Sequence, residues 1–163
     1  MNEDRKAKNN FIIGIISDTH GLLRPEAIEA MQGSDMIIHA GDIGKELVLD
    51  KLRSVAPVVA VRGNMDSECW AYKLRKTEIL ELHKTIIYVT HDINSLDLDP
   101  SASHIHVVIS GHTHRPSIGR HNSVLYINPG SAGPRRFTLP VSSALLNIRG
   151  ISLDAKIITL IKK

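Results

Sequence analysis

Cysteine is nearly absent from the sequence: Cys69 is the single one among 163 residues. One cysteine excludes an intrachain disulfide, and with it the small secreted folds that disulfides hold together. The first ten residues are polar and charged, unlike a secretory leader. Both observations suit a reducing compartment, and we predict a cytoplasmic protein.

Aromatic residues are also few, at 4% of the chain, and the formal net charge is only +3. A nucleic-acid-binding surface needs a basic or aromatic platform, so this class is disfavoured, although a small nucleotide stays open as a ligand. No apolar run approaches the ~20 residues of a membrane-spanning helix. We therefore expect no membrane partner.

Hydrophobic residues make up 42% of the chain and charged residues of both signs are mixed along it. This composition is typical of a globular protein, and the length is enough to bury a core. No repeat, low-complexity tract or linker interrupts the sequence. We expect residues 1–10 to form a flexible lead-in and residues 11–163 to form a single domain.

The first half of the chain alternates short apolar runs with amphipathic segments. Strands are expected at residues 11–17, 36–39 and 57–61, with helices at 25–32 and 45–54 between them. This spacing predicts parallel βαβ units. Ligands of such sheets collect beyond the carboxyl ends of the strands, which makes those ends the place to look for a site.

The second half consists mainly of strands and turns. Seven strands are expected, at residues 77–82, 85–90, 105–110, 116–119, 123–127, 141–148 and 151–161. Three dipeptides are the predicted hairpin turns: His83-Lys84, His121-Asn122 and Arg149-Gly150. Residues 94–103 are polar and contain Pro100, which indicates a loop or a short helix. We predict an α+β sandwich of two mixed sheets flanked by helices, in αββα order.

A polar cluster follows each of five apolar runs. The clusters are Asp18-Thr19-His20, Gly41-Asp42, Gly63-Asn64, His91 and Gly111-His112-Thr113-His114. Together they supply two carboxylates, one amide and four imidazoles. If they converge, the set is too rich for one tetrahedral zinc, but it suits two metal ions about 3.5–4 Å apart that share a bridging carboxylate.

The mixed nitrogen and oxygen donors also limit the choice of metal. They suit Mn, Fe, Zn or Ni better than Ca, which prefers all-oxygen sites. We predict two divalent ions, with Mn²⁺ as the first choice and Fe, Zn, Ni or Mg as alternatives. Taken singly, Asp42 and Asn64 read equally well as turn residues, and His91 as a hydrogen-bonded histidine at a strand end. The ordered series of clusters favours metal binding.

In this order, Asp-x-His, Gly-Asp, Gly-Asn, His and Gly-His-x-His resemble the motifs of the calcineurin-like metallophosphoesterases. The sequences of residues 61–64 (VRGN) and 126–131 (YINPGS) resemble the small single-domain phosphodiesterase branch, which includes the retromer scaffold subunit. The resemblance extends from about residue 11 to the final hairpin. It implies the four-layer αββα metallophosphoesterase fold.

The resemblance also implies roles for individual residues. The ligands are divided between two ions: Asp18, His20 and His114 for the first, and Asn64, His91 and His112 for the second. Asp42 bridges the ions, and Asp42, Asn64 and His91 are the expected catalytic residues. A metal-bridging hydroxide attacks phosphorus in line. The implied substrate is a small phosphodiester or phosphomonoester.

Two positions depart from the family's pattern. Larger relatives carry Gly-Asn-His, whose histidine contacts the substrate, whereas this chain has Met65 at that position. The family often has His-Gly-His where this chain has His91, Asp92 and Ile93, so a carboxylate is expected close to the site. We expect hydrolysis of substrates with good leaving groups. The alternative is a weakly catalytic or non-catalytic interaction scaffold, like the retromer subunit.

The remaining conspicuous residues have structural interpretations. His39 lies inside an expected strand and is predicted to be a hydrogen-bonded core residue, and residues 128–131 are predicted to form a tight return beneath the site. For Arg135 and Arg136 two interpretations stay open, a solvated pair and a phosphate contact. Exposed hairpin edges leave a homodimer open as well.

Overall fold

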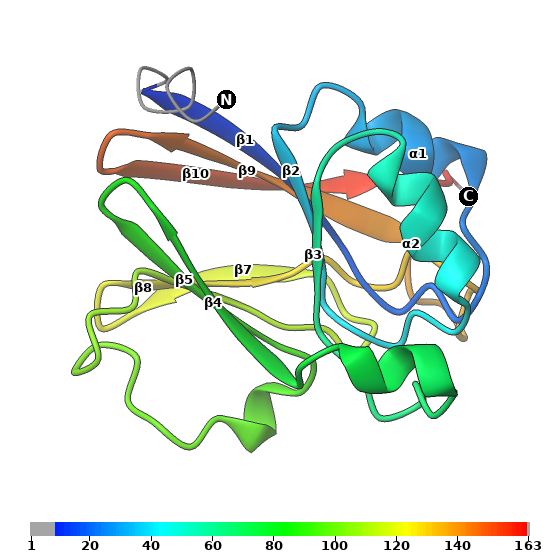
Figure 1. Ribbon diagram of the computed structural model, residues 1–163. Coiled ribbons are helices and arrows are strands. Elements are labelled where there is room, and N and C mark those ends of the chain that lie inside the picture. The colour runs from blue at the N-terminus through cyan, green and yellow to red at the C-terminus, as the bar shows by residue number, and fades with distance from the viewer. Residues whose placement is uncertain (1–8, 163) are drawn as a thin grey trace.

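The computed structural model describes residues 9–162 of the chain. Residues 1–8 of the predicted lead-in lie outside the described residues. The first strand, β1, already begins at Asn10, one residue earlier than expected. Two five-stranded sheets lie one above the other in Figure 1, and the chain crosses from one to the other after residue 60 and returns after residue 128.

The first sheet has the strand order β10-β9-β1-β2-β3. Its three N-terminal strands are parallel, β9 pairs with β1 in the antiparallel direction, and β10 pairs with β9 in the antiparallel direction at the edge. The bounds are β1 (Asn10–Ile16), β2 (Met36–His39), β3 (Val58–Ala60), β9 (Ser142–Arg149) and β10 (Ser152–Thr159). The parallel βαβ prediction for the first half is therefore confirmed.

The second sheet has the strand order β4-β5-β6-β8-β7. Here β5, β6 and β8 are parallel, whereas β4 and β7 are antiparallel edge strands. The bounds are β4 (Thr77–Leu82), β5 (Thr85–Thr90), β6 (Val107–Ile109), β7 (Ser117–His121) and β8 (Val124–Asn128). Both sheets are mixed, as the sequence predicted.

The main core lies between the two sheets. Along β1, Ile13 and Ile15 point into this core, and they pack with buried residues of the second sheet such as Val89 and Ile109. Ile16 belongs to a different buried cluster, the one beneath the helices. Because alternate side chains of a strand point to opposite faces, a continuous apolar run such as that of β1 is buried on both sides.

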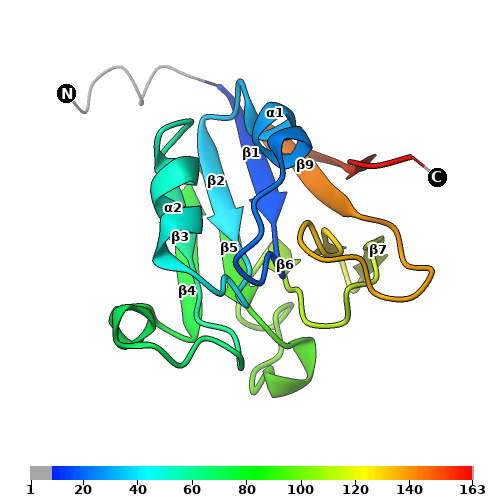
Figure 2. The same ribbon diagram turned by 90° about the vertical axis from the view of Figure 1, so that its right-hand side faces the viewer.

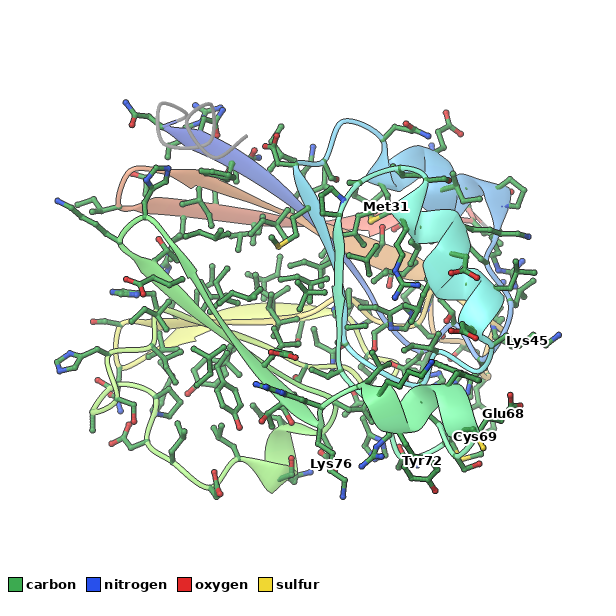
Figure 3. All side chains as sticks on the ribbon, viewed as in Figure 1. Met31, Lys45, Glu68, Cys69, Tyr72 and Lys76 are labelled. Atoms are coloured by element: carbon green, nitrogen blue, oxygen red, sulfur yellow. The ribbon has the colours of Figure 1, made fainter. Side chains whose placement is uncertain are left out.

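Two α-helices cover the outer face of the first sheet, α1 (Pro25–Met31) and α2 (Glu46–Arg53). Figure 2 looks onto this face and shows both helices in front of β1 and β2. Pro25 opens α1, where the missing N–H costs no hydrogen bond. Met31, labelled in Figure 3, closes α1 and packs directly over Gly14 of β1.

The layer outside the second sheet is thin. Apolar side chains of a short 3₁₀ helix, η2 (Ile93–Ser95), and of the loop after it pack against the buried Tyr88 and Val108. Pro100 and the many polar residues of this segment do not support a longer helix. A second 3₁₀ helix, η1 (Cys69–Lys73), follows β3 and was not predicted. The α+β sandwich is confirmed, with little helix on this side.

The three hairpin turns can be compared with their predictions. The β4–β5 turn falls at His83-Lys84, as expected, because Leu82 pairs with Thr85. The other two turns lie one residue later than predicted, at Asn122-Ser123 and at Gly150-Ile151. Within residues 9–162, no helix is long and apolar enough to cross a membrane.

Candidate metal centre

All seven predicted ligands lie in loops at the carboxyl ends of strands, where the two sheets meet. In Figure 2 the arrowheads of β1 and β2 point to the same end of the molecule. Asp18 and His20 follow β1, Asp42 follows β2, and Asn64 follows β3. The second sheet contributes the rest, with His91 after β5 and with His112 and His114 after β6.

Asp18, His20 and His114 form the first group. One ligand atom from each lies within 4.8 Å of the other two. The Nε2 atoms of His20 and His114 are 3.4 Å apart, and Asp18 Oδ1 is 3.3 Å from His114 Nε2. Two residues of the first sheet thus meet a residue 94 positions further along the chain.

Asp42, His91 and His112 form the second group, again with ligand atoms within 4.8 Å of one another. Asn64 joins them, because its Oδ1 lies 3.0 Å from His91 Nε2. Asp42 Oδ2 is 3.2 Å from His91 Nε2 and 3.8 Å from His20 Nε2. Asp42 therefore lies between the two groups, where a bridging carboxylate would have to be.

The buried atoms of the first group support a cation there. Asp18 Oδ1 and His114 Nδ1 are buried and form no hydrogen bond within the described part of the chain. An unsatisfied buried polar atom is costly, so such atoms require a partner. Asp18 Oδ1 faces the converging ring nitrogens of His20 and His114, and a divalent ion among these three atoms would satisfy it. The donor set of carboxylates and imidazoles suits such an ion.

The hydrogen bond of His91 orients its ring. His91 Nδ1 lies 2.7 Å from the carbonyl oxygen of Ala40, and because a carbonyl only accepts, Nδ1 carries the proton. Nε2 is then the ring nitrogen that faces Asp42 and Asn64. A backbone carbonyl that fixes a histidine in this way is a usual support for a metal ligand.

Three groups of the centre have shifted pKa values because they lie close together and are buried. Burial disfavours the charged form of His91, but its hydrogen bond to Asp42 and the nearby charges of Asp18 and Asp42 outweigh this and raise its pKa. Burial likewise raises the pKa of Asp18 and Asp42. The nearby His114 ring and a hydrogen bond from Ser17 at Asp18, and the His91 ring and the Met65 N–H at Asp42, reverse this effect and lower both pKa values. Metal and proton therefore compete for the same atoms.

The backbone at the site adopts an unusual conformation. Five of the seven candidate ligands have positive φ angles, with Asp18 at 54°, His20 at 46°, Asp42 at 53°, His112 at 70° and His114 at 60°. For residues other than glycine the left-handed region costs roughly 1–2 kcal/mol each. Such strain persists only where surrounding contacts hold it in place.

Backbone hydrogen bonds between the ligand loops hold these conformations. Beyond the ends of β1 and β2 the two loops continue to pair: the N–H groups of Asp18 and His20 donate to the carbonyls of Gly41 and Asp42, both at 3.0 Å. The N–H of His112 donates to Asp18 Oδ2 at 3.0 Å, which joins the second sheet to the first. Gly63 allows the closest approach, since a Cβ there would overlap the backbone nitrogen of Asp42.

Asp66 is a supporting residue that sequence reasoning missed. Its buried carboxylate accepts hydrogen bonds from the N–H groups of Ile43 (3.2 Å), Gly44 (3.0 Å) and Gly63 (2.9 Å). It therefore ties the loop after β2 to the loop after β3. The only available signal was an acidic residue two positions after Asn64, in a turn where aspartate commonly bonds to nearby backbone N–H groups.

Residues 128–131 have the structural role that was predicted. Ser131 Oγ donates to the carbonyl of Asp18 at 2.9 Å, and Asn128 Nδ2 donates to the carbonyl of Gly111 at 2.9 Å. His39 is fully buried and bonded on both ring nitrogens, to the Gly41 N–H (3.2 Å) and to Thr19 Oγ1 (3.0 Å). These contacts support the ligand loops from below.

The two departures from the family pattern lie beside the centre. Met65 is 63% exposed, and only its backbone N–H serves the site, as a donor to Asp42 Oδ1 at 2.9 Å. Asp92 Oδ1 accepts from the N–H of Asn94 at the start of η2, and Oδ2 lies 3.9 Å from His112 Nε2. Asp92 is therefore close enough to influence the exposed side of His112.

Two clefts border the centre. The first, of about 310 Å³, is lined by metal-centre residues together with Met65, Pro134, Arg135 and Arg136; we call it the arginine cleft. The second, of about 210 Å³, shares Asn64 and His112 with the first. Arg62, Lys76 and Asp92 also line it, and we call it the Asp92 cleft.

Fold and donor set together define an α+β sandwich with a candidate metal centre at the carboxyl ends of its strands. The chain matches the calcineurin-like phosphoesterase superfamily domain over residues 11–150. It is 37% identical to the probable metallophosphoesterase MJ0623 of Methanocaldococcus jannaschii over 161 residues, which cover 91% of this chain and 81% of that protein. The chain therefore belongs to the calcineurin-like phosphoesterase superfamily.

Two further proteins represent the range of similarity. Phosphodiesterase MJ0936 of the same organism is 31% identical over 136 residues, covering 72% of this chain and 82% of that protein. The solved structure of Vps29 from Chaetomium thermophilum superposes with a TM-score of 0.73 over 91% of this chain and 97% of that chain. Its identity is 20%, so this likeness shows the fold alone.

Proposed function

We propose that the protein is a metal-dependent phosphodiesterase with a dinuclear centre. The observation that carries this proposal is the position of Asp42, whose carboxylate lies between two groups of convergent donor atoms. The likeness to relatives named as phosphodiesterase and as probable metallophosphoesterase supports it. In this proposal Asp18, His20 and His114 hold one divalent ion, and Asn64, His91 and His112 hold the other.

The protein's own groups would position the reacting atoms. When bound, two divalent ions lower the pKa of a coordinated water to about 7, which supplies a hydroxide nucleophile, and they neutralise charge on the phosphoryl oxygens. Asp42 would fix the distance between the ions, with Oδ1 held by the Met65 N–H and Oδ2 facing His91. The Ala40 carbonyl would hold His91 in the tautomer that leaves Nε2 free.

Substrate preference follows from what surrounds the centre. Met65 has no proton to give to a leaving group, so phosphoesters of acidic alcohols such as nitrophenol should react fastest. The arginine cleft, at about 310 Å³, admits a small phosphodiester or phosphomonoester. A non-catalytic scaffold is the competing proposal, but the fold likeness to Vps29 at 20% identity gives it no specific support.

The proposal can be tested with protein stripped of metal and then reloaded with Mn²⁺. We expect metal-dependent hydrolysis of bis(p-nitrophenyl) phosphate and two bound ions per chain. Asp42→Ala should lower kcat/KM at least about a thousandfold, because both ions would depend on this carboxylate. Asp154→Ala, at an exposed acid of β10, is the matched control and should leave the rate unchanged.

The same measurements can also contradict the proposal. Absence of turnover in the reloaded wild-type protein, together with a normal fold, would remove the enzymatic proposal and favour the scaffold. Repeating the reload with Fe, Zn, Ni and Mg tests the preference for Mn²⁺. The metal used, the cytoplasmic location, the homodimer and the single domain spanning residues 11–163 stay predictions.

A further inference from the structure

Arg135 and Arg136 lie in the wall of the arginine cleft, beside five of the proposed ligands. Both side chains are exposed, and within residues 9–162 neither guanidinium donates a hydrogen bond or pairs with a carboxylate. Other arginines are engaged: Arg24 bonds the carbonyl of Gly133, and Arg53 pairs with Asp50. The arginine pair therefore offers two free cations at the mouth of the centre.

The loop that carries the pair is fixed to the site at its base. Ala132 is fully buried, and its N–H donates to the carbonyl of Ser17 at 3.0 Å. Gly133 packs so closely that an added Cβ would overlap the carbonyl oxygen of Thr19. The start of this loop therefore has a set position relative to Asp18, and the arginine pair lies two residues beyond it.

The charge of this cleft exceeds what a simple diester requires. A phosphodiester carries one negative charge, which two divalent ions already outweigh. The arginine cleft adds two guanidinium groups, and Asp42, between the two ligand groups, is the one carboxylate that lines it. Guanidinium groups bind phosphate through paired hydrogen bonds, so such a surplus is suited to another phosphate.

The Asp92 cleft makes a useful contrast. It contains the cations Arg62 and Lys76, but the carboxylate of Asp92 faces them across the same space. The Arg62 guanidinium also lies over the ring of Tyr72, 4.9 Å from its centre. Figure 3 shows Tyr72 and Lys76 at the outer edge of the molecule, next to η1. This cleft is therefore less cationic than the other and better suited to a neutral leaving group.

We propose that Arg135 and Arg136 bind a second phosphate of the substrate, so that the preferred substrates are phosphoesters of compounds that carry another phosphate group. This inference rests on the proposed function for the scissile phosphate. The second phosphate lies in the arginine cleft, which Asp92 does not line. The arginine pair selects the substrate and takes no part in bond breaking.

The test compares two ligands that differ by one phosphate, adenosine 3′,5′-bisphosphate and adenosine 5′-monophosphate. Their dissociation constants are measured by calorimetry on the Mn²⁺-loaded protein. We expect the bisphosphate to bind about tenfold more tightly to the wild type, as for added hydrogen bonds to charged groups. Arg135→Ala/Arg136→Ala should bring the ratio close to one.

Two variants serve as controls. Arg149→Ala/Lys156→Ala removes two exposed cations at other sites and should keep the wild-type ratio, which separates a local contact from net charge. Arg135→Lys/Arg136→Lys keeps the charge but not the paired donors, and should give an intermediate ratio. Thermal melting and metal content of each variant verify that fold and centre are intact.

The outcomes separate this inference from the proposed function. Equal affinity of the wild type for both ligands, or an unchanged ratio in Arg135→Ala/Arg136→Ala, would overturn the inference. A large loss of bis(p-nitrophenyl) phosphate hydrolysis in that variant would also overturn it, because it would place the pair on the scissile phosphate. Absence of wild-type hydrolysis, in contrast, contradicts the proposed function, whereas the binding ratio still reports on the arginine pair.

Discussion

The two ends of the sandwich use the same backbone conformation for different purposes. At the end with the hairpin turns, His83, Asn122 and Gly150 have positive φ angles and are exposed. At the other end, Asp18 and Asp42 have φ angles of 54° and 53° and are buried. A left-handed residue in an exposed turn needs only its neighbours, whereas a buried one needs partners for its polar groups.

The partners at the site end come from far along the chain. Asp66 bonds backbone groups 22 and 23 residues before it, and Ser131 bonds a carbonyl 113 residues before it. At the turn end most hydrogen bonds are the local ones of the hairpins, and the Gly150 N–H also donates to the carbonyl of Asn9 at 3.2 Å. We infer that hydrogen bonds between the loops, which we call cross-bracing, hold the strained backbone at the site end. Removing one of these hydrogen bonds should therefore lower the free energy of unfolding more than a similar change at the turns.

The largest effect is expected for Asp66→Ala. The substitution leaves three N–H groups without their acceptor. Those of Ile43 and Gly63 are buried and that of Gly44 is half-buried, and an unsatisfied buried group costs about 1–3 kcal/mol. We predict a loss of at least about 3 kcal/mol in the free energy of unfolding, together with weaker metal binding, because Gly63 and Ile43 flank two proposed ligands. Denaturant unfolding of the metal-free protein and a metal titration measure the two effects.

The matched change at the turn end is Asn122→Ala. Asn122 is exposed at φ 48°, so only the left-handed conformation is at issue. We expect a loss of about 1 kcal/mol and no change in metal affinity. If the two substitutions destabilised the protein equally, cross-bracing would not be what distinguishes the site end.

A pair of glycines gives the next test. A Cβ at Gly63 would overlap the backbone of Asp42, whereas a Cβ at Gly119, in β7, would meet nothing within 4 Å. Overpacking of this kind costs typically about 1–3 kcal/mol, so Gly63→Ala should destabilise by that amount and displace Asp42. Gly119→Ala should be nearly neutral. Unfolding curves and metal stoichiometry of both variants give the comparison, and intact metal binding in Gly63→Ala would contradict it.

The same difference between the two ends decides which features could be predicted from the sequence. The seven residues from Asp18 to His114 could be predicted because each follows an apolar run, and parallel strands bring their carboxyl ends to one edge. The strands themselves were predicted within one or two residues, and most clearly those such as β1, where burial on both faces leaves a continuous apolar run. Features that depend only on the local sequence pattern could therefore be predicted without the structure.

The hydrogen bonds that join the ligand loops, such as those of Asp66, could not be predicted from the sequence, for a physical reason. Which N–H groups Asp66 meets depends on the register between two loops that follow different strands, and no local pattern contains that register. The same holds for Arg135 and Arg136, whose place in the cleft depends on the anchoring of Ala132 to Ser17. The thin layer over the second sheet and the helix η1 depend on tertiary contacts as well.

The last test concerns His39, which lies beneath the ligand loops. Complete burial lowers the pKa of His39 from its ordinary 6.5 to about 4. Between these values the unfolded chain takes up a proton that the folded chain does not. The free energy of unfolding should therefore fall as the pH is lowered from 6.5 toward 4, by at most about 1.4 kcal/mol per pH unit, and this contribution is fully present above pH 6.5.

Substitution at the two ends isolates this group from the other titrating residues. His39→Asn keeps an acceptor for the Gly41 N–H but cannot titrate, so its stability should depend less on pH than that of the wild type. His121→Asn, at the exposed end of β7, should retain the wild-type dependence. Denaturant unfolding of the chelator-treated protein from pH 4.5 to 7 measures the slopes. Equal slopes in all three proteins would show that the buried end owes its acid sensitivity to groups other than His39.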